Sequence, residues 1–218
     1  MDARAHDLLW LEQPGAFQPA GELPGWLDGA WLARAPLVVR REARPAGRIP
    51  VGARGLQRNQ RCAGVAEAGA VTRRVSPAML AGSLAGSLAG RSAQLAAAAG
   101  DWPCLAALLS LAPRLDALGV EWGPAGGAGF WLASGLPVLR ATSDLDLVVH
   151  APTRLDEATI AGLCALQEKS ACRLDIQVDT GIGGFALAEL AKGAPRVLLK
   201  TAHGPRLVAD PWMQPEAA

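Results

Sequence analysis

The sequence of 218 residues contains no tyrosine, only 5% aromatic residues and three scattered histidines. Its four cysteines, Cys62, Cys104, Cys164 and Cys172, lack Cys-x-x-Cys spacing. This pattern argues against a zinc site or disulfide framework and fits reduced thiols in a cytoplasm. No apolar run approaches the ~20 residues of a membrane span, and no basic start with an apolar stretch indicates a signal peptide. We therefore expect a cytoplasmic protein with no membrane partner.

The length allows one large domain or two small ones. A short Leu-Ala-Gly-Ser repeat at residues 80–90, followed by alanine-rich sequence to Gly100, interrupts the chain. Each glycine inside a helix costs about 1 kcal/mol relative to alanine, so the repeat predicts a loose helix or a linker. We expect a basic N-terminal domain at residues 1–85 and a catalytic domain at residues 86–218.

The most informative segment is Ser143-Asp144-Leu145-Asp146-Leu147-Val148. In a strand, side chains alternate between the two faces, so Asp144 and Asp146 point the same way, about 7 Å apart. Two such carboxylates repel each other unless a positive charge lies beside them, and Mg²⁺ held jointly by carboxylates and substrate phosphates is a common solution. Taken alone, the pair is also compatible with a strand that ends at a solvated edge.

Two flanking segments favour the metal interpretation. Upstream, residues 122–129 form a glycine-dense turn containing Gly126 and Gly127, whose backbone N–H groups could approach a phosphate. Downstream, residues 172–179 alternate apolar and polar side chains, which predicts a strand carrying Asp175 on its polar face.

Between the strands, Thr153 with Asp156 predicts a capped helix that runs to about Lys169. The strand, helix, strand order can place Asp175 beside the pair. This glycine turn, Asp-x-Asp and later carboxylate resemble the site pattern of the nucleotidyltransferase superfamily.

Charge is unevenly distributed although the net charge is only +1. Residues 34–74 hold ten arginines and two acidic residues, whereas residues 101–218 hold 9 basic and 13 acidic residues. Guanidinium groups match phosphate oxygens, so the basic segment suits a polyphosphate substrate; a solvated face is the alternative. Nucleic acid is disfavoured because no aromatic residues are interleaved with the arginines for base stacking.

The remaining pattern predicts an α/β protein, in which a mixed sheet in the C-terminal domain follows a smaller N-terminal α/β domain. Before the repeat we expect a strand at 37–40, a Gly/Arg-rich loop at 51–61 and a helix that starts at Ser76-Pro77. After the repeat we expect a helix capped by Asp101 and interrupted by Pro113. A helix at 185–192 and a strand at 196–200 complete the expected elements.

The chain also resembles one family almost from end to end. That family is the holo-acyl-carrier-protein synthase of malonate decarboxylase, also called phosphoribosyl-dephospho-CoA transferase. The matching segments are 6–10 (His-Asp-Leu-Leu-Trp), 36–41, 49–52, 54–55, 122–124, 129–130, 143–148, 175–178, 183–187, 199–201, 204–208 and 210–212. The chain departs from the family pattern at Gly127, where the family has Ser, and at Trp131, where the family has Glu.

The resemblance implies a nucleotidyltransferase-like fold and a specific reaction. The enzyme would take 2'-(5''-triphosphoribosyl)-3'-dephospho-CoA, transfer its phosphoribosyl-dephospho-CoA part to a serine of the acyl-carrier subunit of malonate decarboxylase, and release pyrophosphate. Metal ions, Mg²⁺ or Mn²⁺, would neutralise the entering and leaving oxygens.

The expected site residues have separate roles. Asp144, Asp146 and Asp175 would hold the metal, and Asp175 could also accept the serine proton. Gly126, Gly127 and Ser143 would contact the triphosphate. The basic residues Arg54, Arg58, Arg61 and Lys200 would bind phosphates or an acidic carrier-protein surface.

Two other functions stay open at this point. The same three carboxylates would serve a nucleotidyltransferase that moves a nucleotide from ATP or CTP to a small hydroxyl or an RNA end. A protein of a different class, a non-catalytic module that binds a carrier protein, would be favoured by loss of a carboxylate, and all three are present.

Overall fold

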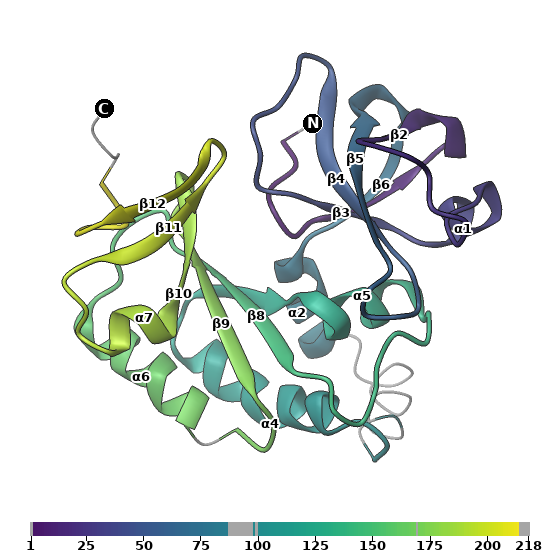
Figure 1. The fold of residues 1–218 in the computed structure, drawn as a ribbon. Coiled ribbons are helices and arrows are strands. Elements are labelled where there is room, and N and C mark those ends of the chain that lie inside the picture. Colours follow the sequence, from purple (N-terminus) through teal and green to yellow (C-terminus); the bar gives the residue numbers. More distant parts are fainter. Residues whose placement is uncertain (1, 87–97, 99, 169, 214–218) are drawn as a thin grey trace. The chain divides into compact units, whose positions relative to one another are not determined.

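The computed structural model describes residues 2–86, 98, 100–168 and 170–213 (Figure 1). The chain divides into two compact units. Unit 1 comprises Met1–Ser76 and Phe130–Val138, and unit 2 comprises Pro77–Gly129 and Leu139–Ala218. The predicted domain boundary between residues 85 and 86 lies in helix α2 (Pro77–Gly86). That residues 1–85 and 86–218 form two separately folding domains stays a prediction. Part of the repeat, residues 87–90, lies outside the described residues.

Unit 1 is built on an antiparallel sheet with the strand order β2-β5-β4-β3-β1-β6. Its strands are β1 (Leu8–Leu11), β2 (Phe17–Pro19), β3 (Leu37–Val39), β4 (Arg48–Arg54), β5 (Arg61–Glu67) and β6 (Val71–Val75). Helix α1 (Gly29–Arg34) and two 3-10 turns, η1 (Pro14–Ala16) and η2 (Ala68–Ala70), connect them. Strand β3 confirms the strand expected at 37–40.

The Gly/Arg-rich loop expected at residues 51–61 is correct only in part, because residues 51–54 belong to β4 and residue 61 starts β5. Ile49, Val51 and Ala53 point alternately into the core of unit 1, and this alternation makes β4 a strand despite its glycine. Gly52, on the opposite face, leaves room for the stem of Arg40, whose Cδ lies 3.5 Å from where a Cβ of residue 52 would be. The loop is thus confined to residues 55–60.

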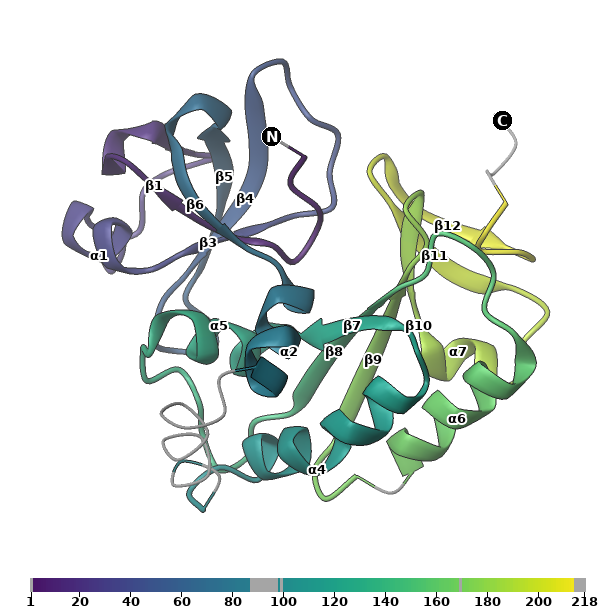
Figure 2. The same ribbon diagram turned by 180° about the vertical axis from the view of Figure 1, so that it is seen from behind.

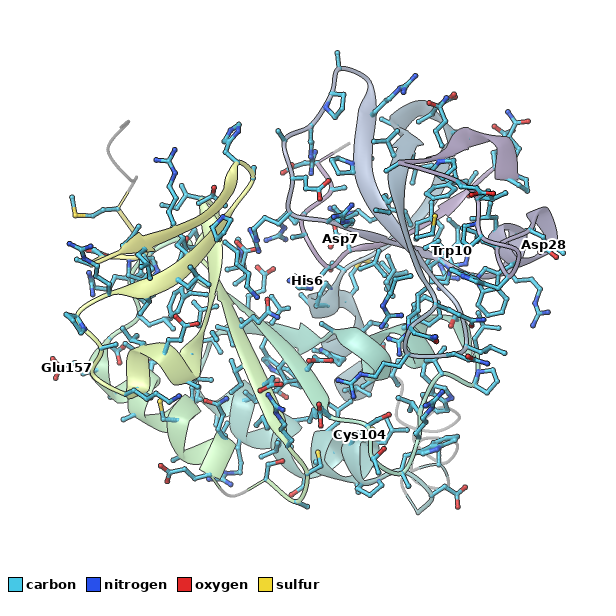
Figure 3. All side chains as sticks on the ribbon, in the orientation of Figure 1. His6, Asp7, Trp10, Asp28, Cys104 and Glu157 are labelled. Atoms are coloured by element: carbon cyan, nitrogen blue, oxygen red, sulfur yellow. The ribbon has the colours of Figure 1, made fainter. Side chains whose placement is uncertain are left out.

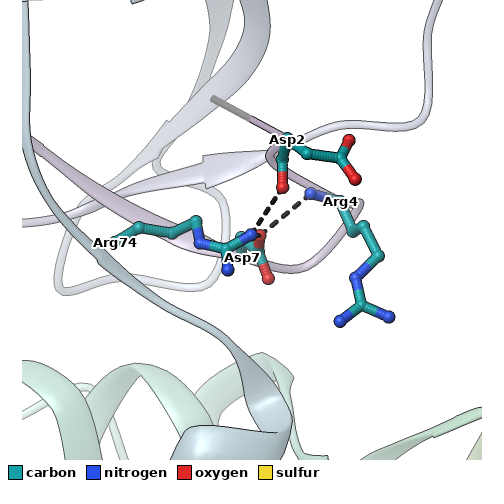
Figure 4. A network of polar contacts seen from close by, with 4 residues as sticks. All are labelled: Asp2, Arg4, Asp7 and Arg74. Carbon is teal, nitrogen blue, oxygen red and sulfur yellow. Dashed lines mark hydrogen bonds and ion pairs between the residues drawn. The ribbon is translucent and has the colours of Figure 1, made fainter.

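A buried carboxylate fixes the start of unit 1 (Figure 4). Asp7 is 1% exposed. Its Oδ2 accepts a hydrogen bond from the backbone N–H of Arg4 (2.9 Å) and pairs with the guanidinium of Arg74 (3.2 Å). His6, inside this turn, has φ +73°, a left-handed conformation that is uncommon for a residue other than glycine. Burial raises the pKa of Asp7 more than Arg4 and Arg74 lower it.

Replacing Asp7 by Asn should therefore change how stability depends on pH. Because the folded state raises the pKa of Asp7 above its ordinary value of 3.8, its contribution to stability is present below that value and is lost as pH rises through the raised pKa. The asparagine side chain does not titrate and keeps an oxygen for the Arg4 N–H. Urea unfolding at a series of pH values should show that the free energy of unfolding of the variant increases relative to that of the parent as pH rises from about 4 to 7. A relative decrease over this range would show that the ion pair with Arg74 outweighs burial.

Unit 2 contains a mixed sheet with the order β12-β11-β10-β9-β8-β7. Its strands are β7 (Glu121–Pro124), β8 (Leu145–His150), β9 (Leu174–Asp179), β10 (Gly183–Ala186), β11 (Val197–Thr201) and β12 (Gly204–Val208). Strands β8 and β9 pair in parallel, and the other recorded pairs are antiparallel. The α/β class and the mixed sheet of the C-terminal part are confirmed.

Different helices pack on the two faces of this sheet. Helices α4 (Pro103–Ala117), α6 (Glu157–Glu168) and α7 (Leu187–Ala191) pack against strands β8 and β9 (Figure 1). Leu145, Leu147 and Ile176, at most 1% exposed, form part of this buried face. On the opposite face α2 packs against β7 (Figure 2), and a Cβ at Gly123 would lie 1.9 Å from the carbonyl oxygen of Pro77. The alternating acidic residues of β8 and β9 belong to this second face.

Three helix predictions need correction. Helix α6 is capped by Asp156 and not by Thr153, because Oδ1 of Asp156 accepts the backbone N–H of Thr159 (2.7 Å). The helix was expected to end at about Lys169, which lies outside the described residues. Helix α4 starts at Pro103 without a side-chain cap from Asp101 and continues through Pro113, which is exposed. Phe185 belongs to β10, where it is buried, so α7 starts only at Leu187. Strand β11 confirms the expected strand at 196–200, and sequence patterns missed β12.

Candidate active site

Pairing of β7 with β8 brings the glycine turn to the Asp-x-Asp segment. Pro124 lies opposite Leu147, and the backbone N–H of Ala125 donates to the carbonyl oxygen of Asp146 (2.8 Å). Helix α5 (Gly126–Ser134) starts at the next residue. The predicted turn is therefore a strand end followed directly by a helix, and its glycines lie in the first turn of that helix.

Gly126 touches the carboxylate of Asp146. A Cβ at residue 126 would lie 1.8 Å from Oδ2 of Asp146, so no side chain fits there without moving the carboxylate. Gly126 also has φ +53°, which disfavours other residues. The first N–H groups of a helix lack acceptors within the helix and carry its positive dipole end. The start of α5 is thus a place where an anionic group could bind next to Asp146.

The third carboxylate lies beside the second. Asp146 and Asp175 are register partners in the parallel pair β8 and β9, so their side chains leave the same face of neighbouring strands about 4.8 Å apart. Asp144 precedes β8 by one residue, and alternation places it on this face as well. All three are half-buried. The structure therefore places Asp146 and Asp175 side by side, with Asp144 on the same face.

Arg173, one residue before β9, is a neighbour of Asp175 that the sequence patterns did not single out. Its Nε lies 3.3 Å from Oδ2 of Asp175, whose side chain is 43% exposed. An ion pair this exposed is worth at most about 1 kcal/mol, so Asp175 can turn away from it at small cost. The i, i+2 spacing of Arg173 and Asp175 in a predicted strand was the signal that could have revealed the pair.

Two thiols border Asp144. Cys104, from helix α4 (labelled in Figure 3), and Cys172, before β9, both have raised pKa values. Burial is the main cause, and the negative charge of Asp144 contributes in both. The thiols are consequently protonated and uncharged near neutral pH, so the charge in this part of the site comes from the carboxylates. All four cysteines are free.

Ser143 and Lys200 differ in how they lie relative to the carboxylates. The Ser143 hydroxyl accepts the backbone N–H of Arg140 (3.0 Å) and so closes the turn that leads to Asp144. Lys200 lies on β11, where it pairs with Gly184, which in turn pairs with Asp179. Lys200 is therefore two strands across and four residues along from Asp175, and the structure does not bring it to the carboxylates.

The predicted arginines belong to unit 1. Arg54 and Arg61 lie directly opposite each other on β4 and β5, and Arg58 is exposed in the loop between them. The guanidinium of Arg54 lies over the ring of Phe130, 5.5 Å from its centroid, and its carbonyl accepts the indole N–H of Trp31 (2.9 Å).

Within residues 2–86, 98, 100–168 and 170–213, no three His, Cys, Asp or Glu side chains are clustered closely enough to form a metal site. Nor does any helix of the described part combine the length and apolar character needed to cross a membrane. What the geometry provides is a carboxylate pair next to a helix N-terminus.

A carboxylate pair on a mixed sheet, bordered by a glycine-started helix, defines an α/β protein with a site suited to a phosphate-bearing group. Comparison with known proteins identifies the family. Residues 4–77 match the phosphoribosyl-dephospho-CoA transferase MdcG N-terminal domain, and residues 76–211 match the MdcG C-terminal domain. The chain belongs to the phosphoribosyl-dephospho-CoA transferase family, a family of transferase enzymes, as the sequence resemblance predicted.

Curated relatives match over almost their whole length. The chain is 42% identical to a phosphoribosyl-dephospho-CoA transferase of Pseudomonas putida (strain GB-1), over 99% of this chain and 98% of that protein. It is 39% identical to the protein of the same name from Klebsiella pneumoniae (strain 342), over 98% of each chain. No solved structure matches the chain significantly.

Proposed function

We propose that this protein transfers the phosphoribosyl-dephospho-CoA group from 2'-(5''-triphosphoribosyl)-3'-dephospho-CoA to a serine of the acyl-carrier subunit of malonate decarboxylase. Pyrophosphate is the second product. The family supports the transferred group, since the relatives are named for it. The observation that carries the chemistry is the position of Asp146, which lies against Gly126 at the start of α5 and beside Asp175.

The reaction is a displacement at phosphorus. The serine oxygen forms a bond to the α-phosphorus, and the bond between the α-phosphorus and the oxygen that bridges to the β-phosphorus breaks. That oxygen takes the electron pair, and pyrophosphate leaves opposite the serine. Asp175 accepts the serine proton in this scheme, because its side chain is 43% exposed and is held only by the weak pair with Arg173.

The carboxylates suit a divalent ion, Mg²⁺ or Mn²⁺. Mg²⁺ usually binds through one or two carboxylates together with substrate phosphates and water. Asp146 and Asp175 form such a pair, with Asp144 on the same face, so a complete cage of protein ligands is not required. When bound, the ion would neutralise charge on the phosphates and align the entering and leaving oxygens.

The first turn of α5 would hold the triphosphate through backbone N–H groups at Gly126 and Gly127. Ser143 retains its hydroxyl proton as a donor while it accepts from Arg140. The arginines of unit 1, Arg54, Arg58 and Arg61, would bind an anionic partner, either phosphate or an acidic carrier surface.

Mass spectrometry of the carrier tests the proposed function directly. Incubation of this protein with the apo acyl-carrier subunit, Mg²⁺ and the triphosphoribosyl precursor should add the mass of phosphoribosyl-dephospho-CoA to the carrier. A carrier with the acceptor serine replaced by alanine is the matched control. Failure to modify the carrier, with nucleotide addition from ATP or CTP instead, would favour the general nucleotidyltransferase. Carrier binding without any transfer would favour a non-catalytic module.

Serine at position 127 should improve transfer. Positive φ is found at Gly126 and not at Gly127, which has helical geometry, so Gly127→Ser introduces no left-handed strain. A hydrogen bond to a charged phosphate is worth roughly 1.5–3 kcal/mol, and each 1.36 kcal/mol is a factor of ten in rate. We expect kcat/KM to rise about 10-fold or more. Gly127→Ala should show no such gain. A stable Gly127→Ser protein with parental kinetics would show that the turn holds phosphate through backbone groups alone.

A further inference from the structure

The sheet face that carries the carboxylates continues across strands β10, β11 and β12. Register pairs connect β9 to β12 through one row of side chains on this face: Asp179, Gly184, Lys200 and Pro205. A second pair on the same face, Leu198 and Leu207, lies two residues from Lys200 and Pro205. The intervening Val197 and Leu199 are at most 1% exposed and face the helices, which confirms the alternation.

Outward residues of these strands combine one cation with exposed apolar surface. Lys200 is exposed, Leu198 is half-buried, and Leu207 is 64% exposed, although large apolar side chains are usually covered. Gly184 and Ala186 of β10, between them and β9, have little or no side chain. A ligand that starts at the carboxylates could therefore pass over β10 close to the backbone.

The charge of this region favours an anion. Residues 196–208 contain Arg196, Lys200 and Arg206 and no acidic residue, although residues 101–218 as a whole are acidic. Arg206 pairs with Leu199, so alternation places it on the opposite face from Lys200. Among the residues of β11 and β12, Lys200 is thus the cation on the face that carries the carboxylates.

Lys200 is too far from the carboxylates to bind the same phosphates. Four residues along the strand are about 13 Å, and two strand spacings are about 10 Å. An anion held by Lys200 must therefore be a second anionic group of the same ligand or belong to another molecule. The proposed substrate has such a group: besides its triphosphate it carries the internal diphosphate of dephospho-CoA, on the far side of two ribose rings.

We propose that this outward face of β10, β11 and β12 is the subsite for the dephospho-CoA arm of the substrate. Lys200 binds the internal diphosphate, and Leu198 with Leu207 lies under an apolar part of the arm. Apolar surface with one well-placed polar group is the usual make-up of a small-molecule site. The inference rests on the proposed function and assigns Lys200 to the transferred group and not to the carrier protein.

Dephospho-CoA alone is the probe, measured by calorimetry without carrier or precursor. Lys200→Gln should weaken its binding about 10-fold or more, since a hydrogen bond to a charged group is worth roughly 1.5–3 kcal/mol. Arg206→Gln removes the same charge from the other face of the same hairpin and should bind like the parent. Leu207→Ser should weaken binding independently of charge. Melting temperatures of all variants verify folding.

Steady-state kinetics provide a second readout. Lys200→Gln should raise KM for the precursor with kcat nearly unchanged, as expected for loss of uniform binding. The inference is overturned if the parent does not bind dephospho-CoA, if Lys200→Gln binds it normally, or if both charge variants weaken it equally. A rise in KM for the carrier alone also overturns it and favours protein docking. Binding of dephospho-CoA without any transfer would refute only the proposed function.

Discussion

Asp146→Asn should reduce transfer at least about 100-fold and leave the melting temperature unchanged or slightly higher. In the proposed function Asp146 holds a divalent ion. Even residues that only support metal ligands cost 10- to 100-fold when changed, so loss of the proposed ligand charge should cost no less. Stability should not fall, because Asp146 and Asp175 are like charges on neighbouring strands and one of them is removed. Single-turnover transfer and thermal unfolding of parent and variant give both values.

The matched control for this experiment is Glu121→Gln. Glu121 belongs to the same sheet, on β7, four residues along the strand from the position beside Asp146. The substitution makes the same chemical change, from a carboxylate to an amide, away from the carboxylate pair. Transfer by Glu121→Gln should therefore stay at the parental rate. Asp146→Asn protein that modifies the carrier at a near-parental rate would show that the carboxylates do not form the reaction centre.

Gly126→Ala should also remove most transfer activity, and for a steric reason. The added Cβ would lie 1.8 Å from Oδ2 of Asp146, so the carboxylate or the start of α5 must move. A displacement of about 1 Å at a reaction centre can cost 10²-fold in rate. The left-handed backbone at residue 126 adds a destabilisation of roughly 1–2 kcal/mol. Transfer kinetics and urea unfolding should show both losses together.

Gly119→Ala separates these two effects. Gly119 has φ +68°, and nothing lies within 4 Å of its virtual Cβ. The Gly119→Ala variant should therefore lose a similar amount of free energy of unfolding and keep its transfer activity. If both alanine variants lose activity in proportion to stability, the contact between residue 126 and Asp146 has no special role. Loss of activity confined to Gly126→Ala would identify the contact as the cause.

The sequence was sufficient to place the three carboxylates on one sheet face because its signals are local. Asp144 and Asp146 share a strand face by alternation alone, and the polar positions of residues 172–179 place Asp175 in the same way. The register of β8 against β9 is not local, since it depends on how α6 packs, so the pairing of Asp146 with Asp175 required the structure. Likewise, composition shows a glycine turn, but only the packed carboxylate shows why residue 126 takes the left-handed conformation.

The errors in the fold have the same origin. Gly52 and its neighbouring arginines conceal a strand, because glycine and arginine at these positions are typical of a loop, while the buried Ile49, Val51 and Ala53 make it a strand. Thr153 and Asp156 are both capping residues by chemistry, and tertiary packing decides that α6 starts after Asp156. The position of Lys200, two strands across from Asp175, likewise required the structure, because a family resemblance contains no distances.

The parallel pairing of β8 and β9 also determines when the site can form during folding. Asp146 and Asp175 are 29 positions apart in sequence, and all of α6 must be accommodated between them before they meet. Antiparallel neighbours such as β11 and β12 are joined by a tight turn and can pair locally within microseconds. Closing the longer loop costs more chain entropy and is slower. Electrostatic repulsion between the two carboxylates opposes this same step, so a divalent cation that binds the pair should accelerate refolding.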